Sequence, residues 1–376
     1  MSADSKPVIG HVLHQLAYAG AEVLAAALAR QLADRYQTVF LCLDGLGKLG
    51  EALQSEGFRV VELGRKPGID LAVSRRIKQA VKEHGIDLLH AHQYTPFFYA
   101  SLSRKLGSKP PLLFTEHGRH YPDQRKLKRV IANKFLWRQH DRATAVGRFV
   151  ARALVSNEGF PRADVQVIYN GIDPDTFMLP NQQQLRYRMR DELKLTEDQP
   201  VILQVARFHP VKDHATSIKA FSHVVEQLPN AVLLLAGDGQ DKPVMQALAK
   251  QLGVADHVRF LGVRTDIPHL MTAADAFVLS SLSEGISVTL LEAMASGVPI
   301  CTTDVGGNGE IVEHTVTGLL SPRQDAKALG ANLVQMLIDP PLRQKFVDAS
   351  RRKLLAQFNQ QQMHDAYTKL YDSMIH

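Results

Sequence analysis

The sequence predicts an α/β protein built from two doubly wound domains. Short, continuously apolar runs alternate with amphipathic stretches of helical period along nearly the whole chain. This alternation is typical of parallel βαβ units whose sheet is covered on both faces. It stops at the turn-rich residues 170–174 and restarts near residue 201. Because 376 residues exceed the usual size of one core, we expect two Rossmann-like domains separated by a cleft.

The first domain is expected over residues 1–175. Its apolar runs predict strands at 8–13, 38–43, 59–63, 87–90, 112–115, 143–146 and 166–169. Its amphipathic stretches predict helices at 21–35, 71–84, 97–106, 125–139 and 149–158. Residues 45–50 are glycine-rich, and we expect them to form a mobile loop near the cleft.

The second domain is expected over residues 176–359, with strands at 201–206, 231–236, 258–261, 276–279 and 299–302. Helices are predicted at 216–227, 242–252, 267–273 and 288–295, whereas residues 180–200 are polar and carry no strand signal. Residues 326–376 are helical in two or three segments, and we expect the last helix, about 360–376, to cross back to the first domain. Ligands of such sheets bind beyond the carboxyl ends of the strands, so the residues that follow each strand are the candidate site.

The bulk composition favours a cytoplasmic protein. No apolar run approaches the roughly 18 residues that span a bilayer. Residues 1–8 lack the basic start and apolar stretch of a signal peptide. The two cysteines, Cys42 and Cys301, lie in apolar runs, which argues against a disulfide framework or a cysteine zinc site.

The positive charge lies in the first half of the chain. Residues 1–175 hold 25 Lys/Arg against 17 Asp/Glu, whereas the remainder holds 19 against 21. Residues 121–152 alone hold nine basic and two acidic residues, interleaved with Ile131, Phe135, Leu136 and Trp137. The segment 124–139 is either a helix that docks on the anionic inner face of the cell membrane or a surface helix packed on the sheet. Nucleic acid is not an expected partner, because no reader motif accompanies this one helix.

Two glutamates eight residues apart, Glu284 and Glu292, follow the strand at 276–279 and enclose a predicted helix start near Ser287. Eight positions make a little over two helical turns, so both carboxylates can face the strand ends. The backbone amides between them, at Gly285, Ile286 and Ser287, can receive a diphosphate. The spacing alone is common on solvated helices, but its position after a strand favours a binding site.

The segments 283–286 (Ser-Glu-Gly-Ile) and 291–299 (Leu-Glu-Ala-Met-Ala-Ser-Gly-Val-Pro) resemble the signature of the family-4 retaining glycosyltransferases, the bacterial group 1 enzymes of GT-B fold. The resemblance implies a nucleotide-sugar donor held mainly by the second domain and an acceptor on the first. It also implies transfer with retention of anomeric configuration, without bound metal or other cofactor. In that family the position of Glu284 holds sugar hydroxyls and that of Glu292 the ribose.

A cationic pair, Arg207 and Lys212, follows the first strand of the second domain. Such a pair can neutralise the charge that develops on a departing diphosphate. Residues 206–213 resemble the family's Gly-Arg-Leu…Lys-Gly motif. They depart from it at Ala206, which replaces the first glycine, and at Asp213, which follows the lysine.

Several first-domain residues follow strands in the same way. Gly20, in Ala19-Gly20-Ala21-Glu22, opens a helix and resembles the phosphate-approaching glycine of the family, which usually has Gly-Gly-Ala-Glu. His117 resembles the cleft histidine that lies near the donor sugar, where a neutral imidazole can bond a hydroxyl or share a proton. His90 and His92 are expected to line the cleft or pack, because no third metal ligand is apparent nearby.

Further loops resemble the family in order along the chain. Gly306 and Gly307 precede Glu310, an acidic position that lies close to the donor in the family. Gly237 follows another strand, and Val263 and Arg264 stand where the family's backbone reads the nucleobase. Residues 170–173 resemble the interdomain hinge.

The sequence therefore predicts a hexosyltransferase that uses UDP-sugar in preference to GDP-sugar and acts on a glycan or lipid-linked acceptor in cell-surface polysaccharide or glycolipid synthesis. Three alternatives stay open. A nucleotide-sugar 2-epimerase shares the architecture. Residues 45–50 fit the G-x-G-x-x-G fingerprint of an NAD-dependent oxidoreductase, although they follow the second strand rather than the first. A catalytically silent relative would bind nucleotide-sugar without releasing the nucleotide.

Overall fold

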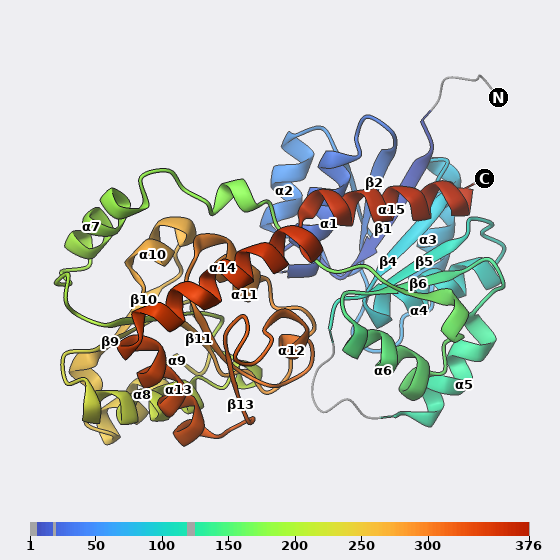
Figure 1. Ribbon diagram of the computed structural model, residues 1–376. Coiled ribbons are helices and arrows are strands. Elements are labelled where there is room, and N and C mark those ends of the chain that lie inside the picture. The colour runs from blue at the N-terminus through green and yellow to red at the C-terminus, as the bar shows by residue number, and fades with distance from the viewer. Residues whose placement is uncertain (1–5, 18–19, 119–124, 376) are drawn as a thin grey trace. The chain divides into compact units, whose positions relative to one another are not determined.

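The structure is a computed structural model that describes residues 6–17, 20–118 and 125–375 (Figure 1). The chain divides into two compact units. The first runs to Asn170 and takes in the chain again from Gln361. The second runs over Gly171–Gln360. The expected domain boundary at residues 175 and 176 lies five residues beyond this division.

The first unit contains a seven-stranded parallel sheet in the order β3-β2-β1-β4-β5-β6-β7. Its strands are β1 (Val8–Leu13), β2 (Gln37–Cys42), β3 (Arg59–Glu62), β4 (Leu88–His92), β5 (Leu112–Glu116), β6 (Arg142–Ala145) and β7 (Val165–Val167). Its helices are α1 (Gly20–Gln31), α2 (Lys48–Ser55), α3 (Ala72–Glu83), α4 (Tyr94–Lys105), α5 (Leu127–Leu136), α6 (Arg148–Glu158) and α15 (Gln360–Ile375).

Helix α15 covers one face of the first sheet, as Figure 1 shows. Tyr367 and Tyr371 of this helix pack in one apolar cluster with Ile9 of β1, Leu88 of β4 and Leu113 of β5. All residues of β4 and β5 are buried, as expected for strands covered on both faces. The last helix therefore belongs to the core of the first unit, as the sequence predicts.

The second unit contains a six-stranded parallel sheet in the order β10-β9-β8-β11-β12-β13. Its strands are β8 (Val201–Val205), β9 (Val232–Ala236), β10 (Val258–Gly262), β11 (Ala276–Leu279), β12 (Ile300–Thr303) and β13 (Leu319–Ser321). Its helices are α7 (Gln182–Glu192), α8 (His214–Gln227), α9 (Lys242–Gln251), α10 (Ile267–Ala273), α11 (Val288–Ser296), α12 (Asn308–Ile311), α13 (Ala326–Ile338) and α14 (Pro340–Gln357). Two parallel-sheet α/β units confirm the predicted fold class.

The sequence prediction missed helices α2, α7 and α12 and strand β13. Helix α2 begins at Lys48, inside the expected loop 45–50, because its first-turn amides are held from outside: Leu49 and Gly50 donate to the Leu16 carbonyl at 3.0 and 3.2 Å. Helix α7 lies in the polar segment 180–200, and the four-residue helix α12 begins inside the glycine-rich segment 304–310. Strand β13 offers only Leu319 and Leu320 as an apolar run, between Gly318 and Pro322.

Each sheet changes winding direction once, and these two points locate the candidate site. In the first unit the reversal lies between β1 and β4, and in the second between β8 and β11. Loops that leave two such strands turn away from each other, so the carboxyl ends of the strands leave room for a ligand.

Candidate functional site

A lysine and a glutamate meet at the reversal point of the second sheet. Lys212 follows β8, and Glu284 follows β11. The Lys212 Nζ donates to the Glu284 Oε1 at 2.5 Å, and the Ser281 hydroxyl donates to the same oxygen at 2.6 Å. The two charged side chains are only 23% and 10% exposed. The sequence prediction named the two charged residues but missed Ser281, which holds the carboxylate in place.

Backbone contacts tie the Lys212 loop to the end of β11. Asp213 adopts a left-handed conformation (φ 44°) and caps α8 by accepting from the Thr216 amide. The Ser280 hydroxyl donates to the Asp213 carbonyl at 2.7 Å, and the Leu282 amide donates to the Val211 carbonyl at 2.8 Å. The lysine and the glutamate are therefore positioned by neighbouring strands and not by a free loop.

The glycine-rich segment after β12 packs directly on the Glu284 loop. A side chain at Gly306 would place its Cβ 2.0 Å from the Glu284 carbonyl oxygen, and one at Gly307 would place it 1.8 Å from that of Gly285. The Gly307 amide donates to the Glu284 carbonyl at 3.2 Å. Glu310, in α12, follows this contact by three residues. The predicted segments 283–287 and 306–310 are thus neighbours in space.

Helix α11 begins at Val288, with Ser287 in the N-cap position and Ile286 buried before it. Glu292 lies on the second turn of this helix and is partly buried. Its desolvation raises the pKa of its carboxyl to about 7. The carboxyl therefore gains or loses a proton near neutral pH, whereas Glu284 is held by a cation and a hydroxyl.

Arg207 and Gly237 follow the adjacent strands β8 and β9. Arg207 is exposed and makes no ion pair with any residue that the structure describes. Gly237 has φ 139°, and a Cβ at that position would stand 2.1 Å from the Ala206 carbonyl oxygen. The backbone at Gly237 therefore passes closely beside the residue that precedes Arg207.

Val263 and Arg264 follow β10, at the edge of the same sheet. Val263 is 74% exposed. The Arg264 guanidinium donates to the Asp266 Oδ1 at 2.7 Å and to the Glu192 Oε1 at 3.0 Å, which raises the pKa of the guanidinium. Arg264 is thus engaged with acidic partners, unlike Arg207.

Four buried histidine nitrogens lie at the reversal point of the first sheet. His90 and His92 are on β4, and His117 follows β5 by one residue. The His92 Nδ1 lies 2.8 Å from the His117 Nε2, and the His92 Nε2 lies 2.8 Å from the Nδ1 of His11 on β1. The sequence prediction missed His11, because only the strand order brings β1 beside β4.

Burial keeps these imidazoles uncharged. Desolvation lowers the pKa of His11 to about 3 and that of His117 to about 4. It also lowers the pKa of His90 and of His92 well below the ordinary value. Nitrogens of His11, His90 and His92 lie within 4.8 Å of one another, an arrangement that could hold a metal ion.

Gly20 is the first residue of α1, is exposed, and has open space where a side chain would stand. Its neighbour Ala19, which replaces the family glycine, lies outside the described residues. The rival fingerprint at residues 45–50 has its first helical amides bound to the Leu16 carbonyl, as described above. Those amides are therefore not available to a dinucleotide phosphate.

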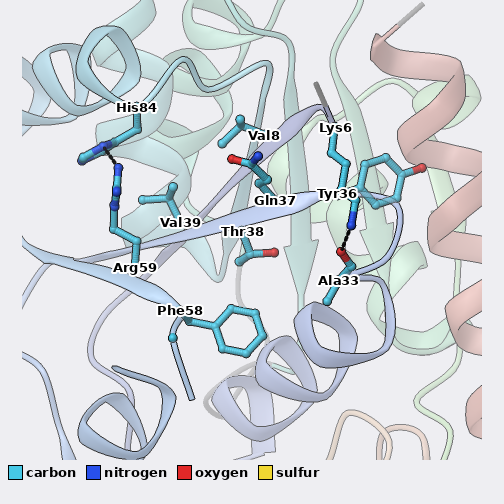
Figure 2. A pocket seen from close by; sticks show the side chains of 11 residues that line it. Lys6, Val8, Ala33, Tyr36, Gln37, Thr38, Val39, Phe58, Arg59 and His84 are labelled. Carbon is cyan, nitrogen blue, oxygen red and sulfur yellow. Dashed lines mark hydrogen bonds between the residues drawn. The ribbon is translucent and has the colours of Figure 1, made fainter. Parts of the chain in front are cut away.

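Figure 2 shows a pocket at the opposite end of the first sheet, where β1, β2 and β3 begin. It is lined by Lys6, Gln37, Arg59 and His84 among others. The Lys6 Nζ donates to the Ala33 carbonyl at 3.0 Å, and an Arg59 nitrogen lies 3.1 Å from the His84 Nδ1. Because ligands of such sheets bind at the carboxyl ends of the strands, this pocket is not part of the candidate site.

Comparisons with known proteins agree with the fold and the motifs. Residues 186–353 match the family described as Glycosyl transferases group 1, and residues 18–176 match Glycosyltransferase Family 4. The N-acetyl-alpha-D-glucosaminyl L-malate synthase of Bacillus anthracis is 28% identical over 366 residues, which cover 94% of this chain and 93% of that protein. EpsF of Bacillus subtilis (strain 168), named as a glycosyltransferase, is 31% identical over 320 residues, which cover 81% of this chain and 80% of EpsF.

Solved structures share the fold at lower identity. A glycosyltransferase from Rickettsia africae ESF-5 has a TM-score of 0.86 at 19% identity and covers 98% of this chain and 99% of that one. HepE from Anabaena, in complex with UDP and glucose, has a TM-score of 0.84 at 20% identity and covers 97% of this chain and 99% of that one. With strand-end loops in the family's order and a relative above 30% identity over four-fifths of its length, this chain belongs to the family-4, or group 1, glycosyltransferases of GT-B fold.

Proposed function

We propose that the chain transfers a hexose-type sugar from a nucleotide-sugar donor, UDP-sugar in preference to GDP-sugar, with retention of anomeric configuration. The acceptor is a glycan or lipid-linked molecule of cell-surface polysaccharide or glycolipid synthesis. The transfer needs no bound metal, because Arg207 and Lys212 supply the positive charge that the departing diphosphate requires. The protein acts in the cytoplasm.

The Lys212–Glu284 contact at the reversal point of the second sheet carries this proposal. A half-buried lysine that already touches a carboxylate offers two more donor positions to a phosphate. The glutamate, fixed by Ser281, keeps its second oxygen for a sugar hydroxyl. This contact thus places a cation for the departing diphosphate beside a carboxylate oxygen that can accept a hydrogen bond from the sugar. A nucleotide-sugar donor needs both groups.

The remaining residues take the parts that the family resemblance assigns. Glu292 accepts from the ribose, and the backbone of Gly285 to Ser287 lies along the diphosphate. Arg207 stabilises the departing charge together with Lys212. The diphosphate oxygen then takes the proton of the acceptor hydroxyl as the new glycosidic bond forms on the same face. His117 hydrogen-bonds the sugar that is transferred.

Named relatives supply the donors and acceptors to test. HepE was solved in complex with UDP-glucose. Another relative is named as a GDP-mannose-dependent mannosyltransferase of Mycobacterium tuberculosis, 27% identical over 313 residues. The Bacillus anthracis relative is named N-acetyl-alpha-D-glucosaminyl L-malate synthase, a name that contains both an N-acetylglucosaminyl group and L-malate. UDP-glucose, UDP-N-acetylglucosamine and GDP-mannose therefore form the donor panel, and L-malate joins the lipid-linked acceptors.

The first experiment measures protection against thermal unfolding by each donor, followed by release of the nucleotide diphosphate in the presence of acceptors and of a chelator. We expect one UDP-sugar to protect most and to turn over with chelator present. Product formed without any acceptor would indicate a 2-epimerase instead. Binding without nucleotide release would indicate a silent relative, and loss of turnover in chelator would contradict metal independence.

The second experiment tests the cationic pair. We expect Arg207→Ala or Lys212→Ala to lower turnover on the order of 100-fold, the typical cost of losing one such stabilising contact. Lys250→Ala, on an exposed lysine of α9, is the matched control. Turnover like that of the wild type in either of the first two variants would remove that residue from the mechanism.

We also propose that helix α5 docks on an anionic membrane surface. Leu127, Ile131 and Phe135 follow one another every four residues on one face, and their side chains are 65%, 63% and 66% exposed. Exposed cations flank this stripe at Arg125, Lys126, Lys128 and Lys134. No helix in the described part of the chain is long and apolar enough to span a bilayer, so such docking would be peripheral.

Part of this helix packs on its own unit, and part of it is exposed. Leu136 is buried, and Trp137 donates to the Asp164 carboxylate at 3.0 Å, so these two anchor the segment to its own unit. Ile131 and Phe135 face outward, with the Lys105 ammonium 4.6 Å from the Phe135 ring centre. The exposed apolar stripe with a basic rim is the pattern of an interfacial helix.

Liposome sedimentation tests the docking. We expect binding to vesicles with anionic lipid at low salt, weaker binding to neutral vesicles, and loss of binding in an Ile131→Ser, Phe135→Ser double variant. Ile338→Ser changes an equally exposed apolar residue (61%) of the second unit and is the control. Absence of binding to anionic vesicles at low salt would refute the proposal and leave the transferase proposal intact.

A further inference from the structure

Three histidines of the first unit form a continuous hydrogen-bonded row. It runs from His11 on β1 through His92 on β4 to His117 after β5, with both nitrogen–nitrogen distances at 2.8 Å. The His11 and His92 rings stack at 5.2 Å between centres, and the His92 and His117 rings at 5.1 Å. His11 is 1% exposed and His92 3%, so neither faces solvent.

The row couples the proton positions of its three members. A hydrogen bond between two neutral imidazoles needs one N–H and one bare nitrogen. His92 uses both of its nitrogens in the row, so it donates at one end and accepts at the other. Only two patterns are possible: all three rings carry the proton on Nδ1, or all three carry it on Nε2. The tautomer of His117 is thus decided together with that of His11.

The two end nitrogens of the row distinguish the two patterns, because the His11 Nε2 is not among the buried nitrogens that lack a hydrogen-bond partner in the described part of the chain. The His117 Nδ1 is buried and has no hydrogen-bond partner among the described residues. A buried N–H without an acceptor is rarer in proteins than an acceptor without a donor. In addition, Nε2–H is the intrinsically preferred tautomer of a neutral histidine. Both considerations favour the second pattern, with a bare lone pair on the His117 Nδ1.

We propose that His11 and His92 are positioning residues that hold His117 in its Nε2–H tautomer, so that its Nδ1 is a fixed acceptor for a ligand hydroxyl. The role of this hydroxyl as part of the transferred sugar rests on the proposed function. The direction of each bond follows: the His117 Nε2–H donates to the His92 Nδ1, and the His92 Nε2–H donates to the His11 Nδ1. A hydroxyl that meets the His117 Nδ1 therefore has to donate, which orients it.

The lowered pKa values of the row agree with this role. Burial lowers the pKa of both end members, His11 and His117, far enough that they are neutral at pH 7. A charged His117 would carry N–H on both nitrogens and could accept from nothing. Neutrality is thus a condition for the acceptor, and the row satisfies it.

His90 lies beside the row but outside it. Its ring centre is 4.1 Å from that of His92, and its nitrogens lie 2.7 Å from the Tyr371 hydroxyl and 2.7 Å from the Thr115 hydroxyl. These partners leave His90 no free nitrogen for a metal ion. Both nitrogens of His92 take part in hydrogen bonds as well. The compact group of His11, His90 and His92 is therefore a hydrogen-bonded cluster and not a metal centre.

The proposal is tested by NMR on protein with 15N-labelled histidine, because bare and protonated ring nitrogens resonate in separate regions. Signals of His117, assigned by their loss in His117→Asn, should show a protonated Nε2 and a bare Nδ1. In His11→Leu the coupling is cut, and the His117 signals should shift towards a mixture of tautomers. In His11→Asn the side-chain oxygen can replace the His11 Nδ1 as acceptor, and the wild-type pattern should return.

Turnover with the best donor provides the second readout. We expect His11→Leu to lower kcat roughly 3- to 10-fold, the range set by the net contribution of one hydrogen bond, and His11→Asn to recover most of it. His84→Leu, at the opposite end of the sheet, should behave like the wild type. If His11→Leu does not fold, the NMR spectra of the wild type and of His11→Asn still test which nitrogen of His117 carries the proton.

Three results would overturn the proposal: a His117 proton on Nδ1 in the wild type, a His117 tautomer unaffected by His11→Leu, or an unchanged kcat in that variant. One equivalent of metal that is retained by the purified wild type and lost in His11→Leu would also overturn it. Failure of the transferase proposal would appear as absence of turnover with every donor, and the NMR measurement does not depend on it.

Discussion

Acidification is expected to destabilise the first unit far more than the second. Four histidines of the first unit, His11, His90, His92 and His117, have pKa values that burial lowers below the ordinary value of about 6.5. At a pH between these lowered pKa values and 6.5, the unfolded state binds protons that the folded state does not bind. The free energy of unfolding therefore falls as the pH drops below 6.5.

The size of this loss in unfolding free energy follows from the difference between the pH and the pKa of histidine in the unfolded state. At pH 5, each neutral buried histidine costs about 2 kcal/mol relative to pH 7, since one pH unit below the unfolded pKa is worth about 1.4 kcal/mol. His11 and His117, with pKa values of about 3 and 4, together amount to about 4 kcal/mol, which is near the whole stability of a marginal domain. The lowered pKa values of His90 and His92 act in the same direction. Glu22, whose pKa burial raises, offsets a small part of this loss.

The second unit has opposing contributions. Burial lowers the pKa of His214 to about 4, which costs about 2 kcal/mol at pH 5 by the same reasoning. Desolvation raises the pKa of Glu292 to about 7, so the folded state takes up a proton first and gains about 2 kcal/mol over the same interval. The two nearly cancel.

The single tryptophan, Trp137, lies in the first unit and reports on its unfolding alone. Urea titrations at pH 7.5 and pH 5.0, followed by its fluorescence, should show a much lower midpoint at pH 5.0. Circular dichroism should then resolve a second transition whose midpoint hardly moves. His11→Asn should lessen the pH effect on the fluorescence transition by about 2 kcal/mol, whereas His84→Asn should not. A fluorescence midpoint that is equal at the two pH values would refute the reasoning.

Three further predictions concern single sites. Gly307→Ala should weaken donor binding measured by calorimetry, because its methyl group would stand 1.8 Å from the Gly285 carbonyl oxygen and displace the loop; wild-type affinity would contradict this packing. Asp141→Ala should cost about 3–5 kcal/mol of unfolding free energy in urea, because it leaves the buried Arg104 guanidinium unpaired; a loss below 1 kcal/mol would contradict it. Between pH 6 and 8 donor affinity should rise about tenfold as the Glu292 carboxyl ionises, and Glu292→Gln should abolish that pH dependence.

Much of the fold could be predicted because its signal is local. Twelve of the thirteen strands lie in apolar runs that can be recognised, whereas β13 offers only Leu319 and Leu320 between a glycine and a proline. Helix α7 was not predicted because Leu185 and Met189 are too few to give an apolar period. The helix is anchored by Arg186 and Arg190, which donate to the Asp275 carboxylate at 2.7 and 2.8 Å. Because Asp275 lies more than eighty residues away along the chain, these contacts produce no periodic pattern in the sequence of the helix.

The residues of the candidate site also fall into two groups: those that a local signal in the sequence reveals, and those that depend on contacts between distant segments. Residues in the loops that follow strands, such as Lys212, Glu284 and His117, could be named because strand ends are visible in the sequence. The contact between Lys212 and Glu284 could not, since it depends on β8 lying beside β11. His11 sits inside a strand and gains its role only from the neighbouring strand, so nothing local distinguishes it from a packed histidine.

The place of helix α15 has a consequence for how the protein is made. Its tyrosines Tyr367 and Tyr371 cover the apolar face formed by Ile9, Leu88 and Leu113. The ribosome, however, synthesises these tyrosines only after the whole second unit. The nascent first unit therefore emerges with that face bare and has to wait through the synthesis of the second. During this interval the second unit can complete its own core, so the unit that is translated first is the one that matures last.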